Sequence, residues 1–120
     1  MYYYISTNEK RRVQTNMKQR RRNEAERRAL ENRLYEAILR LDTVAECRNF
    51  FVDLCTPAEV EALSDRWEVV RMLMKKESYR TIAEQTGVSL TTIGRVARFL
   101  HGPHEGYKSV LMKTGEWKDD

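Results

Sequence analysis

The second half of the chain contains a segment whose side chains suit hydrogen bonding to a polyanion. Residues 89–100 include two arginines, Arg95 and Arg98, and no acidic residue. Thr91 and Thr92 precede these arginines at helical spacing. An arginine guanidinium can donate two parallel hydrogen bonds to guanine, and a threonine can bond a phosphate or a base edge while its methyl contacts a thymine methyl. The segment therefore indicates nucleic-acid binding.

The sequence offers little for catalysis or metal binding. The only histidines, His101 and His104, flank Gly102-Pro103, and no nucleophile lies near them in a recognisable arrangement. Cys47 and Cys55 are eight residues apart, whereas paired zinc ligands are usually separated by about two to four residues. We therefore expect neither an enzyme nor a metal site.

Cysteine content and hydrophobic runs indicate the compartment. Cys47 and Cys55 both fall in helical patterns, so we expect free, buried thiols in a reducing compartment. No run approaches the ~18 apolar residues that a membrane span needs. Residues 1–5 are too short for a signal-peptide core and are followed by polar residues. These features predict a cytoplasmic protein without membrane contact.

Charge is distributed unevenly along the chain. The net charge of +4 is only a mild bias toward anionic partners. Residues 10–33, however, carry ten Lys or Arg and three Glu, whereas residues 34–120 carry twelve Lys or Arg and fourteen Asp or Glu. We expect residues 1–22 to form a basic arm, disordered or a frayed helix, which is either a solvated tail or a contact for phosphates.

Residues 78–100 carry the signature of a helix-turn-helix unit. Ser78 caps one helix and Ser89 caps the next. Between them Gly87 occupies a turn that needs a left-handed backbone, which glycine adopts at little cost. The apolar positions that would pack the two helices together are Ile82, Ala83, Val88, Ile93 and Val96. This pattern over about twenty residues predicts a DNA-binding unit whose second helix, residues 89–100, is the recognition helix.

The exposed side of the recognition helix supplies the candidate DNA contacts. Gly94 should cost this helix about 1 kcal/mol relative to alanine, which either close approach to DNA or tight packing within the protein would explain. Arg80, near the start of the first helix of the pair, is well placed for a phosphate. The residues expected to contact DNA are Arg80, Ser89, Leu90, Thr91, Thr92, Gly94, Arg95 and Arg98.

The elements before and after this unit are also helical. A first helix begins near Asn23, and its apolar face consists of Leu30, Leu34, Ala37, Ile38 and Leu41. Thr43 and Glu46 form a capping box for a second helix, whose apolar stripe consists of Val44, Cys47, Phe51 and Leu54.

A third helix has the clearest start signal in the sequence. Thr56 is its N-cap, Pro57 takes its first position and Glu59 completes a capping box. A short helix around Tyr107 closes the domain. No strand pattern occurs, so we predict an all-α domain over residues 23–112, followed by a polar tail over residues 113–120.

The segments FFVDLCTPAEVEALSDRWEVVRML, residues 50–73, and TGVSLTTIGRVARFL, residues 86–100, resemble the Trp repressor superfamily and, more closely, the YerC/YecD Trp-repressor-related family. The resemblance covers roughly residues 30–108. It implies a bacterial, nucleoid-associated transcriptional regulator, most simply a repressor. It also implies an intertwined homodimer, in which the first three helices of two chains interlock and each subunit presents its recognition helix to one half of a two-fold site in double-stranded DNA.

The resemblance also bears on a small-molecule effector. Trp repressors hold a tryptophan corepressor with a threonine and two arginines, which match Thr56, Arg66 and Arg95 here. Two positions depart from the family pattern, because Val96 and Phe99 stand where the repressors have a glycine beside the indole and a serine for the ligand's amino group. These larger apolar side chains would fill the pocket. We therefore expect no tryptophan corepressor, and another small ligand stays open.

Two other functions fit the same residues. Related helix-turn-helix units serve as DNA-docking modules in transposases and replication initiators. Alternatively, the chain is an RNA-binding adaptor that acts through its basic segment, residues 10–33. Deleting residues 1–22 separates these hypotheses, because a regulator should keep its sequence preference whereas an RNA binder driven by the arm should lose nearly all binding.

Overall fold

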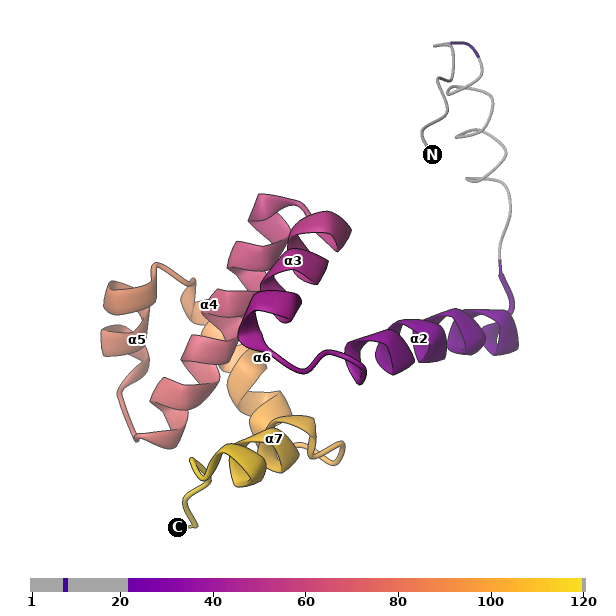
Figure 1. The fold of residues 1–120 in the computed structure, drawn as a ribbon. Helices are drawn as coiled ribbons and strands as arrows, with labels where there is room; N and C mark the ends of the chain where they lie inside the picture. The colour runs from indigo at the N-terminus through magenta and orange to yellow at the C-terminus, as the bar shows by residue number, and fades with distance from the viewer. Residues whose placement is uncertain (1–7, 9–21, 120) are drawn as a thin grey trace. The chain divides into compact units, whose positions relative to one another are not determined.

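The structure, a computed structural model, describes Asn8 and residues 22–119. Over these residues the chain forms six helices and no strand, which confirms the all-α fold. The arm predicted for residues 1–22 lies outside the described part, apart from Asn8 and Arg22. The helices shown in Figure 1 are α2 (Glu24–Ile38), α3 (Val44–Leu54), α4 (Pro57–Met74), α5 (Tyr79–Thr86), α6 (Leu90–Leu100) and α7 (Gly106–Thr114). The chain forms two compact units, Met1–Cys47 and Arg48–Asp120, and the boundary between them falls within α3.

Helix α2 belongs to the first unit and begins at a side-chain cap. The Asn23 Oδ1 atom accepts a hydrogen bond of 2.8 Å from the backbone N–H of Glu26, and Glu24 and Glu26 in the first turn oppose the positive end of the helix dipole. None of the α2 residues is buried. Tyr35 is exposed, and Leu39, which follows the helix, is 81% exposed. Of the apolar face predicted for this helix, Leu30 and Ala37 are exposed, whereas Leu34, Ile38 and Leu41 are half-buried.

Helix α3 begins with a variant of the predicted capping box. The Thr43 hydroxyl accepts from the backbone N–H of Glu46 at 3.1 Å, as predicted. The Glu46 carboxylate, however, accepts from the N–H of Asp42 at 2.8 Å, one residue further back than the predicted partner. Both interactions satisfy backbone donors at the helix start, which have no partner within the helix.

The expectation of buried thiols is wrong for this chain. Cys47 is exposed and Cys55 is half-buried, and both are free. Cys47 lies on a helix without a buried residue, and of its apolar stripe only Phe51 is half-buried.

The predicted capping box at the start of α4 is confirmed. The Thr56 hydroxyl accepts from the backbone N–H of Glu59 at 3.2 Å, and Glu59 Oε1 accepts from the backbone N–H of Thr56 at 2.9 Å. The hydrogen bonds from the backbone N–H and then the hydroxyl of Thr56 lower the pKa of Glu59. Pro57 occupies the first turn, where its missing N–H costs nothing.

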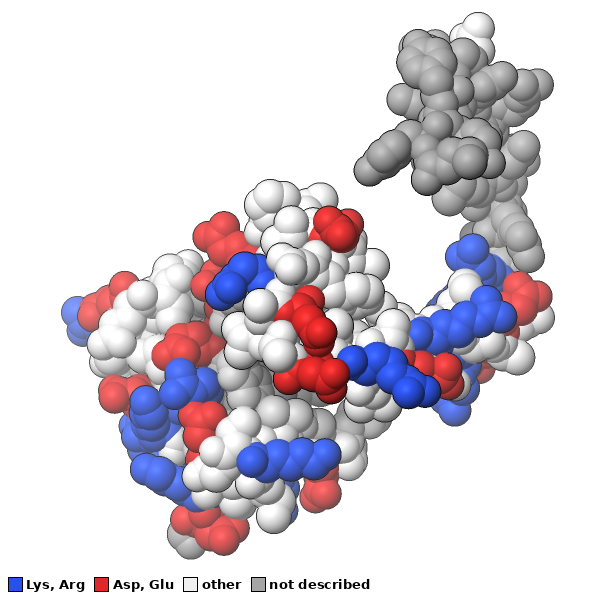
Figure 2. All heavy atoms as spheres, viewed as in Figure 1, with Lys and Arg blue, Asp and Glu red and all other residues white. Residues whose placement is uncertain are grey.

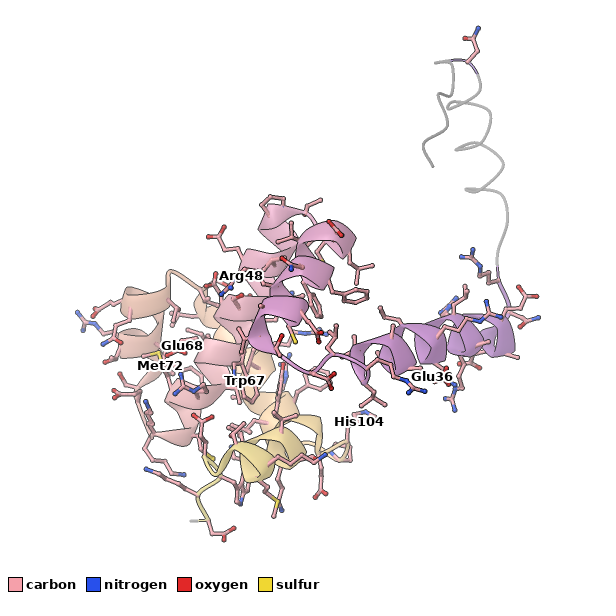
Figure 3. The ribbon with its side chains drawn as sticks, viewed as in Figure 1. Glu36, Arg48, Trp67, Glu68, Met72 and His104 are labelled. Carbon is pink, nitrogen blue, oxygen red and sulfur yellow. The ribbon has the colours of Figure 1, made fainter. Side chains whose placement is uncertain are left out.

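The core of the second unit is built on the second half of α4. Trp67 and Met72, labelled in Figure 3, lie on this half, and the Trp67 ring packs at 6.4 Å from that of Tyr107 on α7. The first half of α4 contributes no buried residue, and Leu63 there is exposed. The buried residues are Val69, Val70, Met72 and Met74 of α4, Ile82 of α5, Ile93, Val96 and Leu100 of α6, and Leu111 of α7.

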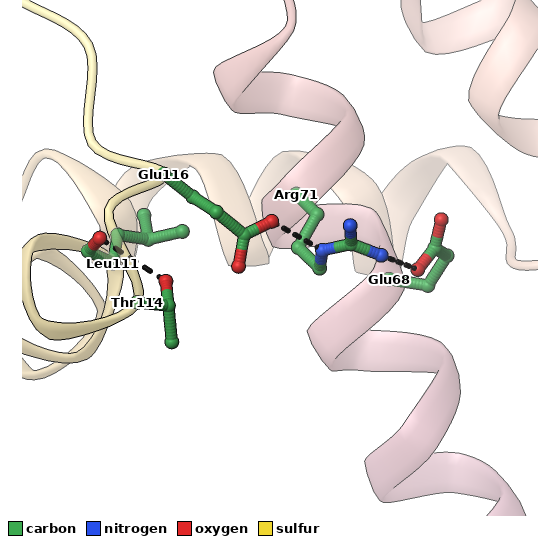
Figure 4. A network of polar contacts seen from close by, with 5 residues as sticks. All are labelled: Glu68, Arg71, Leu111, Thr114 and Glu116. Atoms are coloured by element: carbon green, nitrogen blue, oxygen red, sulfur yellow. Dashed lines mark hydrogen bonds and ion pairs between the residues drawn. The ribbon is translucent and has the colours of Figure 1, made fainter.

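The end of the chain differs from the polar tail expected over residues 113–120. Helix α7 continues through Thr114 and stops at Gly115, whose φ is +77°. Trp117 then packs against the core of the second unit. Figure 4 shows Arg71 of α4 between Glu68 and Glu116, to which its guanidinium donates hydrogen bonds of 3.0 Å and 2.6 Å. A half-buried aromatic ring and an ion pair thus hold residues 116 and 117 against the core and α4.

Candidate nucleic-acid interface

The turn between α5 and α6 fixes how the two helices meet. Gly87 ends α5 with φ +74°, the left-handed conformation predicted from its type, and its N–H donates to the carbonyl of Ala83. The Thr86 hydroxyl donates to the carbonyl of Ile82 at 2.7 Å and accepts from the N–H of Val88 at 3.1 Å. One hydroxyl therefore bridges the last turn of α5 to the chain that enters α6.

Helix α6 separates an inner face from an outer one. Ile93, Val96 and Leu100 are buried in the core, which fixes the rotation of the helix about its axis. The residues that are exposed instead are Leu90, Thr91, Arg95, Arg98 and Phe99. Helix α6 contains no acidic residue, so its outer face offers hydrogen-bond donors and positive charge without a competing carboxylate on the same helix.

Two of the predicted contact residues are used within the helix start. Ser89 is the N-cap, and its hydroxyl accepts from the N–H of Thr92 at 3.1 Å. The same hydroxyl donates to the Thr92 Oγ1 atom at 3.0 Å. Thr92 is half-buried, whereas Thr91 beside it is exposed. Thr91 is thus the threonine of this turn that is free to face a ligand surface.

Gly94 lies on the outer side of α6 with empty space around it. A Cβ atom built at this position would meet no atom within 4 Å. Packing within the chain therefore does not require glycine here, which removes one of the two explanations that the sequence left open.

Arg80 of α5 is a predicted basic contact with a highly accessible side chain. Its side chain is 89% exposed, and its Nε atom donates to Glu84 at 3.1 Å, one turn further along the helix. Exposed ion pairs of this kind contribute little free energy. The guanidinium is therefore available to exchange Glu84 for a phosphate.

Residues of α4, α6 and α7 line a cavity of about 210 Å³. The structure brings Arg66 and Arg95 together here, as the resemblance implied, whereas Thr56 is not among the lining residues. Val96 forms part of the wall, as predicted. Phe99 does not line the cavity and is exposed, with the Arg95 guanidinium 5.0 Å from its ring centroid. The lining residues are Arg66, Thr92, Arg95, Val96 and Tyr107.

Tyr107 is a site residue that sequence reasoning missed. Its only signal was its apolar spacing with Val110 and Leu111, which predicts a helix face and no function. In the fold α7 contacts α6, and Tyr107 and Arg66 both line the cavity.

Acidic residues are numerous in the helices that precede the α5–α6 pair. Figure 2 shows acidic side chains on the surface around α3 and α4, with Arg48, labelled in Figure 3, among them. Asp53, Glu59 and Glu61 there are exposed. A protein with an acidic surface and a basic recognition helix is oriented by the field of a polyanion as it approaches.

The described residues contain no group of three His, Cys, Asp or Glu side chains that could hold a metal ion. His101 forms the C-cap of α6, and His104 follows it in an exposed loop. In the same part of the chain, no helix combines the length and the apolar character that crossing a bilayer demands.

Known proteins share this arrangement. The sequence pattern of the family described as Trp repressor protein matches residues 24–115, which include all of α2 to α7. The uncharacterized protein YerC of Bacillus subtilis (strain 168) is 40% identical over 85 residues, which make up 71% of this chain and 82% of YerC.

Two solved structures are similar in fold as well as in sequence. A TrpR-like protein from Eubacterium eligens ATCC 27750 is 41% identical, with a TM-score of 0.68, and the match covers 73% of this chain and 91% of that one. A candidate Trp repressor from Staphylococcus aureus is 34% identical, with a TM-score of 0.71, over 82% of this chain and 100% of that one.

Proposed function

Because this chain belongs to the Trp repressor family, we propose that it is a transcriptional repressor that binds specific sites in double-stranded DNA through the major groove. Helix α6 enters the groove in this proposal. Thr91 and Arg98 contact base edges, and Arg80 contacts a phosphate of the backbone.

The observation that carries this proposal is the division of α6 into two faces. Three buried residues anchor its inner face, while Thr91, Arg95 and Arg98 stand exposed on a helix without acidic residues. A rigidly held helix with exposed donors meets the requirement for reading base edges, because the donors keep a fixed geometry relative to the groove.

We further propose that the active form is a homodimer. Apolar side chains remain exposed on α2, on α3 and on the first half of α4, including Tyr35, Val52 and Leu63. Val52 is 64% exposed. A second copy that covered these faces would bury them and would also supply a second α6, so that the preferred site has two-fold symmetry.

We propose that tryptophan is not the effector. The Val96 side chain occupies part of the wall of the cavity between Arg66 and Arg95. An indole in this cavity would have to compete with that side chain for the space.

Selection of binding sites from random duplex DNA, followed by footprinting, tests the proposed function. The expected result is a near-palindrome whose half-sites lie about 34 Å apart, one turn of the double helix. The matched control is the chain with Thr91 and Arg98 both changed to alanine, which should enrich the same site much less strongly than the wild type. A wild-type pool with no enriched sequence would contradict the proposal.

A further inference from the structure

The exposed side of α6 carries a large apolar side chain at the start of the helix. Leu90 is the first residue of the helix and is 60% exposed. It follows the cap residue Ser89 and precedes Thr91, so it lies at the end of α6 that enters a groove first in helix-turn-helix proteins. An exposed leucine in this place is available for an apolar contact with a ligand in the groove.

The space beside Leu90 is open because residue 94 has no side chain. Positions four apart on a helix are neighbours on its surface, and a helical side chain leans back over the turn that precedes it. A side chain at position 94 would therefore lean toward Leu90. Since a Cβ there would meet no atom within 4 Å, glycine leaves open space over the helix backbone next to Leu90.

The major groove presents one apolar group that fits the open space beside Leu90. The edges of guanine, cytosine and adenine expose hydrogen-bond donors and acceptors, whereas thymine also exposes its 5-methyl group. Burying Leu90 against a polar edge would leave donors or acceptors without partners. Burying it against a methyl removes apolar surface from water on both sides.

Resting on the proposed function, we propose that Leu90 and Gly94 read the 5-methyl group of a thymine in each half-site. Leu90 supplies the apolar contact, and Gly94 leaves the room in which the methyl lies. Arg98, one turn beyond Gly94 on the same side, then contacts the neighbouring base pair. The pair Leu90–Gly94 thus determines specificity through shape, in addition to the hydrogen bonds of Thr91 and Arg98.

Replacing thymine by deoxyuridine tests the proposal, because it removes the methyl and leaves every hydrogen bond of the base in place. The full chain is titrated against the selected site with one thymine at a time replaced in both half-sites. At one position the wild type should bind uracil DNA about four-fold more weakly per half-site, the value expected for one buried methyl. Leu90→Ala should bind the thymine and uracil sites equally.

Gly94→Ala adds a methyl to the protein where the DNA methyl is expected. This variant should bind the thymine site more weakly than the wild type, because the two methyls compete for one space. When the same thymine becomes uracil, its affinity for DNA should fall less than that of the wild type, or should rise. Its melting temperature should be unchanged or higher, since the added Cβ meets nothing and alanine favours the helix. Arg80→Ala is the matched control and should weaken binding equally on both DNAs.

The outcomes separate the two proposals. A selected site at which uracil replaces thymine everywhere without loss, or a Gly94→Ala variant that loses equally on thymine and uracil DNA, overturns the methyl contact and leaves the repressor proposal standing. A pool without any preferred sequence overturns both.

Discussion

The Nε atom of Arg71 lies 2.6 Å from Oε2 of Glu116, across 45 residues of sequence. The same guanidinium donates to Glu68 from its other side. Since Arg71 stands on α4 and Glu116 follows α7, this contact ties the end of the chain to the helix that leads into the helix-turn-helix unit. Lys118 adds a contact from its backbone N–H to the sulfur of Met74 at 3.3 Å.

The Arg71–Glu116 contact predicts a dependence of stability on pH. The hydrogen bond from Arg71, followed by one from Thr114, lowers the pKa of Glu116 from its ordinary value of 4.5. A carboxylate whose pKa is lowered in the folded state stabilises that state above its unfolded pKa, and this contribution is lost as the pH falls through the folded value. Thermal unfolding of Glu116→Gln should show lower stability than wild type at pH 7, with the difference shrinking below pH 4.5.

Glu77→Gln is the control, because Glu77 is an exposed glutamate of the loop between α4 and α5. It should unfold like the wild type across the same range. A Glu116→Gln variant whose deficit is as large at pH 3 as at pH 7 would contradict the ion pair as the cause.

Local signals made the helix boundaries predictable. Thr56 with Pro57 and Glu59 marks the start of α4, and Ser89 marks that of α6, because each cap is formed by residues within one turn of each other. Gly87 likewise reveals a left-handed turn through its residue type alone. Contacts between distant residues leave no such signal. Nothing near Glu116 in the sequence points to Arg71, 45 residues earlier.

The candidate site was predictable to the same extent. The outward residues of α6 follow from helical periodicity, because the buried positions fix the exposed ones. The cavity was not fully predictable, because it lies where three helices meet and its Tyr107 comes from an element with only a weak pattern. The prediction that Cys47 is buried was wrong for a different reason. Periodicity identifies an apolar stripe but does not tell whether the same chain or another covers it.

A charge placed at Val52 on the exposed apolar surface of α3 should prevent two chains from associating. Val52 is exposed in the single chain, so Val52→Asp buries no charge in a monomer. If two copies cover this surface, the aspartate meets an apolar interface and association should weaken by several kcal/mol. Light scattering at about 1 μM should give the mass of two chains for wild type and of one chain for the variant. A wild-type mass near one chain would contradict the dimer.

Adding L-tryptophan should change neither the melting temperature nor the affinity for the selected DNA site. A ligand present at one hundred times its dissociation constant would stabilise the folded state by about 2.7 kcal/mol, which is easily detected as a thermal shift. Val96→Gly enlarges the cavity on the side where Val96 stands. Its response to tryptophan shows whether that side chain is the obstacle. A clear shift of the wild type would mean that Val96 leaves room for the indole.

Separating base reading from phosphate contact is the last test of the α5–α6 unit. Arg98→Ala or Thr91→Ala should reduce discrimination at defined base pairs by about 1–3 kcal/mol, since each removes a side chain that faces base edges in the proposal. Arg80→Ala should instead weaken binding evenly across sequences. It should also lower the slope of log K against log salt concentration by roughly one unit, because one fewer phosphate is neutralised. If Arg98→Ala lowers the affinity for specific and random DNA equally, Arg98 contacts the phosphate backbone and not a base. If Arg80→Ala lowers the affinity only through one base pair, Arg80 contacts a base in the groove.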